Sequence, residues 1–368
     1  MIRERITPFQ LGCLCFSFLS GFSTLYLLEA KLLMQDVWIA NLTACLFILM
    51  LLKMNAYVQN QYPHANMSDI IDIVLGKWLG KLAHAFYLLG MLGLGVLSLR
   101  SISVFYTSAI LPGTSPNLIM LLVVIVTTYA ASLGLSTIAR SVLVILPFFV
   151  VSIVAIGFFI YQDVEANPFM PQLQHPLPLL LYGSLISFGF PFCKSYVMVF
   201  LFSEVTHQKK LFKSCSIAVV FSCAYLLIAT YLTIGSLGDN MFKTAMFPFF
   251  SSIQLVKFGE YIERIEILII AIWTIMTMYE IIVLQYVFVQ IAGRLFGMKA
   301  LKPFYLPVGV FFFAVATKSF VNPAELVAYD LKILPVSVNL NAVLVPVCVF
   351  VLTLFKKRGG SVQELNHS

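Results

Sequence analysis

Long apolar runs separated by short polar segments dominate this sequence. Ten runs stand out, at residues 9–28, 37–58, 82–108, 117–135, 141–161, 178–202, 214–237, 265–290, 303–320 and 333–355. A helix needs about 20 apolar residues to cross the hydrocarbon core of a bilayer. A spanning β-barrel would show short alternating strands instead. We therefore expect an all-α, polytopic membrane protein with about ten transmembrane helices.

The segment between the second and third runs, residues 66–81, has the pattern of a short amphipathic helix. Ser68 can cap it, and Asp69 and Asp72 suit the positive end of the helix dipole. Its apolar face, which ends at Trp78, predicts a helix lying in the cytoplasmic interface. A plain connecting helix is the alternative.

Three further segments complete the layout. Residues 162–177 contain three prolines and predict an extended outer loop. The stretch Phe247–Val256 predicts an amphipathic piece on the outer surface. The polar tail 357–368 predicts disorder, and no separate soluble domain is indicated.

Composition and charge placement agree with a membrane protein. The 368 residues are 60% apolar and only 11% charged, with a mean hydropathy of +0.96, whereas soluble domains have about 25% charged residues. The net charge of +7 does not indicate nucleic-acid binding, because the basic residues lie in short loops. With the N-terminus inside, cytoplasmic segments hold fifteen of them and outer segments six. This bias predicts that both termini are cytoplasmic.

Motifs for catalysis or metal binding are not found. The seven cysteines lie inside apolar runs and the five histidines are scattered, so neither a zinc site nor a disulfide framework is indicated. GxSxG, P-loop and HExxH patterns are missing. We expect no cofactor, no metal and no enzymatic activity.

The first run of each half contains helix-breaking residues, at Leu19–Thr24 and at Ser187–Pro191. Matching interruptions predict an inverted-repeat transporter fold, with the binding site at the breaks. A single domain, 1–368, would then contain repeat one at about 7–161 and repeat two at about 178–356. The alternative is that these glycines serve close helix packing.

Two ionisable residues lie deep in predicted spans. Lys194 precedes the inner end of its run by eight residues and Glu280 by ten, which corresponds to similar depths of about 12 and 15 Å. An isolated charge at that depth is costly, so we expect an internal ion pair. The alternative is that Lys194 extends toward the interface and Glu280 is neutral or faces water.

Several short motifs resemble the B-subunit family of bacterial spore germination receptors. They are TPFQ near the start, Gly21, LGKWLGK at 75–81, FPFF at Phe247–Phe250, and YIERIE followed by AIW at 271–273. The resemblance covers residues 7–356. It implies a fold similar to the amino acid–polyamine–organocation transporters, the five-plus-five, leucine-transporter-like inverted repeat. It also implies the inner membrane of the endospore, a membrane A subunit and a lipoprotein C subunit as partners, and amino acids, sugars or nucleosides as germinants.

Some functional positions carry over from this resemblance. The family's glycine in the first span falls on Gly21, and its pocket position in the third span falls near Leu94, followed by Ser98. The Gly-Glu pair that often follows Phe-Pro-Phe is absent, because this chain reads FPFCKSY. Pocket positions in the eighth span fall near Thr277, Tyr279 and Glu280.

The type of germinant decides which groups are needed. An amino acid would use free N–H groups after a break, carbonyls near Ser20–Phe22 and Glu280; a sugar would use hydroxyl groups. We favour the amino acid. The candidate ligand-binding residues are Ser20, Gly21, Phe22, Ser23, Leu94, Ser98, Ser187, Gly189, Phe190, Thr277, Tyr279 and Glu280.

The sequence leaves three functional interpretations. The leading one is a germinant-sensing subunit that signals to partner subunits. The second is a secondary amino-acid transporter coupled to H⁺ or Na⁺, and the third is a membrane scaffold without a ligand of its own.

Overall fold

The computed structural model describes residues 5–63, 65–164, 168–255, 265–320 and 322–365. In these ranges the chain is helical apart from turns, loops and one isolated β-bridge between Ile6 and Val205. The YIER residues at 261–264 and the side chain of Phe22 lie outside the described part.

Helices account for every predicted apolar run; η marks a short 3₁₀ or π-helical segment. The first half contains α1 Pro8–Ser23, α2 Leu28–Leu33, η1 Met34–Asp36, α3 Val37–Gln61, α4 Met67–Phe105, η2 Tyr106–Ile110, α5 Pro116–Ser132 and α6 Leu135–Tyr161. The second half contains α7 Leu177–Ser187, η3 Phe188–Phe192, η4 Cys193–Glu204, η5 Gln208–Lys210, α8 Leu211–Thr244, α9 Pro248–Leu255, α10 Ile265–Phe296, η6 Lys302–Phe304, α11 Tyr305–Ser319, α12 Pro323–Lys332 and α13 Leu334–Leu365.

Seven helical stretches of the described chain are long and apolar enough to cross a membrane, or eight if the bent pair Lys302–Ser319 and Pro323–Lys332 counts as one span. Pro8–Gly21 and Pro116–Ser132 are shorter apolar helices. Large apolar side chains such as Phe47, Val151 and Phe158 remain exposed. Such exposure is expected where lipid is the solvent, so the molecule is a multi-pass membrane protein.

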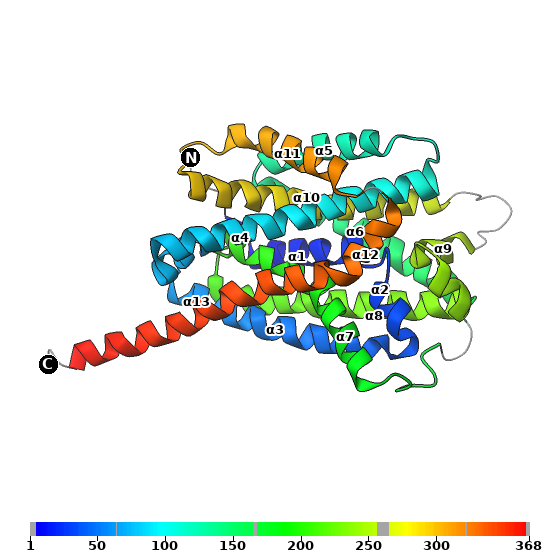
Figure 1. The fold of residues 1–368 in the computed structure, drawn as a ribbon, viewed down its shortest axis with the longest axis horizontal. Coiled ribbons are helices and arrows are strands. Elements are labelled where there is room, and N and C mark those ends of the chain that lie inside the picture. Colours follow the sequence, from blue (N-terminus) through cyan, green and yellow to red (C-terminus); the bar gives the residue numbers. More distant parts are fainter. Residues whose placement is uncertain (1–4, 64, 165–167, 256–264, 321, 366–368) are drawn as a thin grey trace.

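The helices lie side by side along the long axis of the molecule, and the chain begins and ends at the same end of that axis (Figure 1). Helix α1 occupies the centre of the bundle. It packs against α6, α8 and α10 and touches η3 and η4. The centre therefore brings the first run of each half against the same partner, α10.

The short helix predicted at 66–81 is present, with a different cap. The cap is Asn66 rather than Ser68: Asn66 Oδ1 accepts a 2.8 Å hydrogen bond from the Asp69 N–H, and Asp69 Oδ2 accepts a 3.3 Å bond from the Asn66 N–H. Asn66 has the extended backbone that an N-cap requires, whereas Ser68 is already helical. Gly76, at φ +81°, bends the chain between this helix and the long remainder of α4.

One expectation at the C-terminal end was wrong, and one helix there was not predicted. Helix α13 continues to Leu365, so most of the tail predicted to be disordered is helical. Residues 323–332, which were not predicted to be regular, form α12. Asn322 caps α12 by accepting a hydrogen bond from the Glu325 N–H at 2.8 Å, and Pro323 occupies the first turn.

Candidate functional site

The first helix stops near the middle of the molecule. Helix α1 ends at Ser23, Leu27 adopts a left-handed backbone at φ +45°, and α2 begins at Leu28. The non-helical residues are thus Thr24–Leu27, later in the chain than the predicted Leu19–Thr24, and Ser20 and Gly21 are helical. The carbonyls of Ser20 and Gly21, expected to be freed by the break, accept hydrogen bonds instead from Ser23 Oγ and Thr277 Oγ1.

Gly21 has a packing role. A Cβ at this position would lie 2.8 Å from backbone atoms of Met276 and Thr277 in α10. Thr277 Oγ1 donates a 2.9 Å hydrogen bond to the Gly21 carbonyl oxygen. The glycine therefore permits α1 and α10 to cross in backbone contact, which was the alternative explanation for the motif.

The first apolar run of the second half, which contains α7, η3 and η4, changes conformation at Phe190. Helix α7 ends at Ser187, and Phe190 has φ −143° and ψ +124°, far from helical values. Pro191 follows and has no N–H to donate. Beyond this point η4 runs on as a 3₁₀ helix to Glu204. Backbone regularity is thus lost within the predicted segment Ser187–Pro191.

A buried ion pair lies beside these two discontinuities. Lys194 Nζ is 2.6 Å from Glu280 Oε2, and both side chains have 0% exposure. Ser98 Oγ of α4 donates a 3.0 Å hydrogen bond to Glu280 Oε1. The pair therefore ties η4 to α10, and Ser98 adds α4 through the second carboxylate oxygen.

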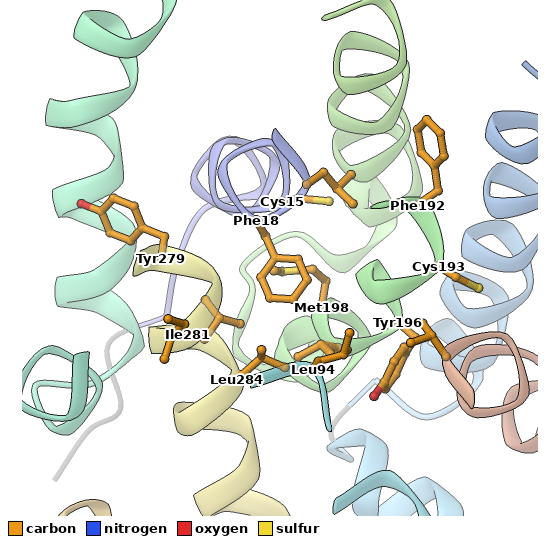
Figure 2. Packing of buried hydrophobic residues seen from close by; sticks show 14 of the residues in the cluster. Cys15, Phe18, Leu94, Phe192, Cys193, Tyr196, Met198, Tyr279, Ile281 and Leu284 are labelled. Atoms are coloured by element: carbon orange, nitrogen blue, oxygen red, sulfur yellow. The ribbon is translucent and has the colours of Figure 1, made fainter. Parts of the chain in front are cut away.

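Aromatic rings surround the ammonium group of Lys194. Its Nζ lies 4.6 Å from the ring centre of Phe190 and 5.5 Å from that of Phe18. Phe18 faces Leu94 in the packed centre (Figure 2). Cation–π attraction is strongest where water is excluded, so these rings help to hold the buried charge.

Four other residues predicted to bind the ligand, Ser20, Ser187, Gly189 and Tyr279, each contact a different helix. Ser20 Oγ lies 3.3 Å from Ser222 Oγ of α8, and Ser187 Oγ donates to Asn41 Oδ1 of α3. Gly189 lies against Pro335 of α13. Tyr279 points away from Phe18 and Leu94 (Figure 2). Its hydroxyl lies within hydrogen-bonding reach of Ser141 in α6. Ser187, Gly189 and Tyr279 therefore do not join the ion-pair cluster.

One cavity opens directly at the two discontinuities, and we call it the Glu29–Asp330 cavity. Ser23 and Phe190, both predicted site residues, line it. The full lining is Ser23, Tyr26, Leu27, Leu28, Glu29, Leu97, Ile186, Phe190, Asp330 and Leu334. Its volume is about 20 Å³, which is room for one water-sized group.

A second small cavity, the aromatic cavity, lies on another side of the Thr24–Leu27 segment. Thr24 and Leu25 line it together with Phe105, Phe249, Phe250 and Trp273 and with the side chains of Ile153, Ile253 and Ile270. Its volume is about 30 Å³. An amino acid needs more space than either cavity offers. Binding one at this site therefore requires α1 and η3 to move apart.

The residues that sequence reasoning missed are mainly in these cavities. Glu29 reads as an interfacial residue at the end of an apolar run, and Asp330 lies in a segment with no predicted regular structure. The available signal for Asp330 was local: Asn322, Pro323 and Glu325 form a helix-start pattern that predicts α12. Its burial depends on α12 folding back against α13 and α4.

A polar cluster joins α4 and α10 away from this centre. Arg294 pairs with Asp69 at 2.8 Å and with Asp72 at 3.0 Å, and His84 Nε2 lies 3.1 Å from Asp72 Oδ1. The short helix that starts at Met67 is thereby bound to the end of α10. Because Arg294 is half exposed, each of these pairs contributes little to stability.

Comparison with known proteins identifies the family. A model of the family described as "Spore germination protein" matches residues 5–322. The chain belongs to the spore germination protein family. The resemblance inferred from its motifs is thereby confirmed.

Curated relatives cover most of the chain at low identity. Spore germination protein KB of Bacillus subtilis (strain 168) is 22% identical over 362 residues, which is 97% of this chain and 97% of that protein. Spore germination protein A2 of the same organism is 21% identical over 295 residues, covering 78% and 79%.

Solved transporter structures share the fold. MhsT in complex with L-phenylalanine aligns with a TM-score of 0.64 at 12% identity, covering 96% of this chain and 99% of MhsT. A Na⁺-coupled sialic acid symporter aligns with a TM-score of 0.67 at 13% identity, covering 92% and 79%. The all-helical architecture is therefore that of leucine-transporter-like proteins, as expected.

Proposed function

We propose that this chain is the germinant-sensing membrane subunit of a spore germination receptor. It binds a small nutrient molecule at mid-membrane and passes the resulting movement to a membrane A subunit and a lipoprotein C subunit. The family match and the transporter fold support this proposal. We place the protein in the inner membrane of the endospore with both termini cytoplasmic.

The architecture proposed for this function is a five-plus-five inverted repeat of ten spans. The ten are α1, α3, α4, α5, α6, α7 with η3 and η4, α8, α10, α11 and α13. In this scheme α1 with α2, and α7 with η4, are broken spans that begin repeats one and two. The supporting observation is that Thr24–Leu27 and Phe190 both leave helical geometry and line or adjoin one cavity.

We propose an amino acid as the germinant. The site combines apolar walls with a few polar groups, as small-molecule sites do. The observation that carries the proposal is that both discontinuities, at Leu27 and at Phe190, line one cavity. Since the cavities are small, a ligand must bind a more open arrangement of α1 and η3 better than the closed one. That preference is what a receptor converts into a signal.

Binding by the purified full-length protein tests the proposal. We expect saturable binding of a radiolabelled amino acid that is weakened at least tenfold by Phe190→Ala. Phe158→Ala is the control, because Phe158 is exposed on an outward face. The same variants in spores should show germination defects in the same order. Failure to bind any amino acid, sugar or nucleoside at millimolar concentration would overturn the proposal.

A secondary transporter is the second candidate, because the structural relatives include a Na⁺-coupled symporter. Uptake into proteoliposomes that contain only this chain separates the two functions. Binding without uptake, together with loss of germination in a deletion strain, supports the receptor. Saturable uptake that requires a Na⁺ or H⁺ gradient supports the transporter.

A further inference from the structure

Two carboxyl groups from distant parts of the chain face the same small cavity. Glu29 lies in α2 and Asp330 in α12, and the two residues are 3% and 6% exposed. Both line the Glu29–Asp330 cavity, beside the residues where α1 and α7 lose helical geometry. The fold thus brings two acids together in a place that is nearly closed to solvent.

Neither acid forms an ion pair with a described residue. Glu29 Oε1 and Asp330 Oδ1 are buried and accept no hydrogen bond from any described residue. Lysine, arginine and histidine are missing from the cavity lining. The basic residues that follow Glu29 in α2 and Leu97 in α4 donate to backbone carbonyls: Lys31 Nζ to that of Ala245 at 2.6 Å, and Arg100 Nη2 to that of Phe320 at 2.8 Å.

Burying an unpaired carboxylate costs several kcal/mol. Proteins avoid this cost by protonating the carboxyl group, by pairing the charge or by binding a cation. Within the described ranges no basic side chain supplies the pairing, and the cavity that both acids line has a volume of about 20 Å³. A positively charged occupant of the cavity would supply it.

The size and the lining of the cavity select the occupant. A volume of about 20 Å³ admits one water-sized group. Ser23, Tyr26, Glu29 and Asp330 offer side-chain oxygens to a cation in this cavity. Two carboxyl groups in one apolar cavity also hold a single negative charge more readily than two. Phe190 and Tyr26 add aromatic groups, which attract monovalent cations and ammonium groups.

We propose that the Glu29–Asp330 cavity binds one small monovalent cation, either an alkali metal ion or a primary ammonium group. The bound cation joins α2 to α12 next to Phe190. Because the ring of Phe190 also contacts Lys194, the cation site and the buried ion pair share a wall. This proposal goes beyond germinant sensing, and its test requires no germinant.

The test measures thermal unfolding of the purified full-length protein by tryptophan fluorescence at fixed pH and ionic strength. NaCl, KCl, NH₄Cl and methylammonium chloride are compared with choline chloride, whose cation is too large for the cavity. Binding to the folded state raises the unfolding temperature with a saturable dependence on cation concentration. We expect a rise of several degrees that saturates for at least one small cation.

Variants locate the effect. Glu29→Gln and Asp330→Asn keep the shape of the side chains and should each reduce the cation-dependent shift by more than half. Asp239→Asn, at an exposed acid of α8, should retain the full shift. If a variant does not fold, binding of ²²Na⁺ or ⁸⁶Rb⁺ to the wild-type protein, with displacement by unlabelled salts, tests whether one small cation binds, and the variant that does fold locates the site.

The salt series separates the two sources of the cation. A shift with Na⁺ or K⁺ alone assigns an inorganic ion, and a shift with ammonium and methylammonium alone assigns the amine of an organic ligand. Equal behaviour in choline and small-cation salts would overturn the proposal, as would an undiminished shift in Glu29→Gln and Asp330→Asn. A response to Ca²⁺ only would overturn the assignment to a monovalent cation.

Discussion

The carbonyl oxygen of Gly21 accepts a 2.9 Å hydrogen bond from Thr277 Oγ1, which joins α1 to α10 two residues before α1 ends. The Thr277 hydroxyl group and the absence of a side chain at Gly21 thus both hold α1 against α10 at the same point. Thr277 Oγ1 also lies 3.0 Å from the Trp273 carbonyl, within its own helix. Because α10 also provides Glu280, this crossing sets the position of the buried ion pair relative to α1.

Gly21→Ala should destabilise the protein by about 1–3 kcal/mol, because the added Cβ would meet backbone atoms that cannot rotate away. The expected readout is a lower unfolding temperature in detergent. The matched control is Gly93→Ala in α4, where a Cβ would lie 3.7 Å from the Tyr329 hydroxyl oxygen. Similar unfolding temperatures for the two variants would contradict the close crossing.

Lys194→Met or Glu280→Met alone should destabilise the protein by about 3–5 kcal/mol, because each leaves one buried charge without its partner. The double variant should recover much of this loss, since no buried charge remains. Lys213→Met, at an exposed lysine, is the control. Unfolding temperatures of the four variants provide the measurement. A double variant no more stable than the worse single variant would show that the pair is not coupled.

Exchanging the two charges gives an independent check. Lys194→Glu and Glu280→Lys should each reduce the yield of folded protein, and the double exchange should restore part of it. Full restoration is not expected, because Ser98 donates to the carboxylate and Phe18 and Phe190 face the ammonium group. Size-exclusion profiles in detergent measure the outcome.

Asp36→Ala should loosen the loop that connects the two halves. The Asp36 carboxylate is fully buried and accepts hydrogen bonds from the backbone N–H groups of Leu173, Gln174 and His175, and from His175 Nδ1 at 2.8 Å. Hydrogen bonds to a charged group contribute about 1.5–3 kcal/mol each. We expect faster proteolysis within 168–176. Asp163→Asn, an exposed acid near the same loop, should leave the cleavage rate unchanged.

Asn66→Ala should destabilise the start of α4 by about 1 kcal/mol, because it removes the side-chain oxygen that accepts the hydrogen bond from the Asp69 N–H. Faster amide hydrogen exchange at residues 67–71 measures the effect. Ser115→Ala is the control, since Ser115 precedes α5 without a side-chain cap. Equal exchange in both variants would show that the cap does not stabilise this helix.

Much of the fold could be predicted from the sequence, because the bilayer restricts spanning segments to apolar helices of a certain length. Each apolar run that matches the thickness of the membrane coincides with a helix. Local patterns were less exact. Asn66 rather than Ser68 caps the helix that starts at Met67, and α12 was missed because ten residues are too few for a hydropathy pattern to stand out.

The candidate site could be predicted from the sequence only in part. Matched depth in two spans indicated that Lys194 and Glu280 could meet, and they lie 2.6 Å apart. The same reasoning could not orient side chains around each helix, so it grouped Tyr279 with Glu280 although Tyr279 faces α6. Adjacent residues on a helix point in directions about 100° apart, so one faces the centre while its neighbour does not.

The sequence by itself determined the environment of the protein, its helices, its family motifs and the presence of deep charges. These follow from composition and spacing, because lipid excludes unpaired backbone groups and isolated charges. Only the tertiary structure decided that Gly21 is a contact point with α10 and that Glu29 and Asp330 share a cavity. Such relations join residues hundreds of positions apart, and they depend on how helices rotate and cross, which local sequence does not specify.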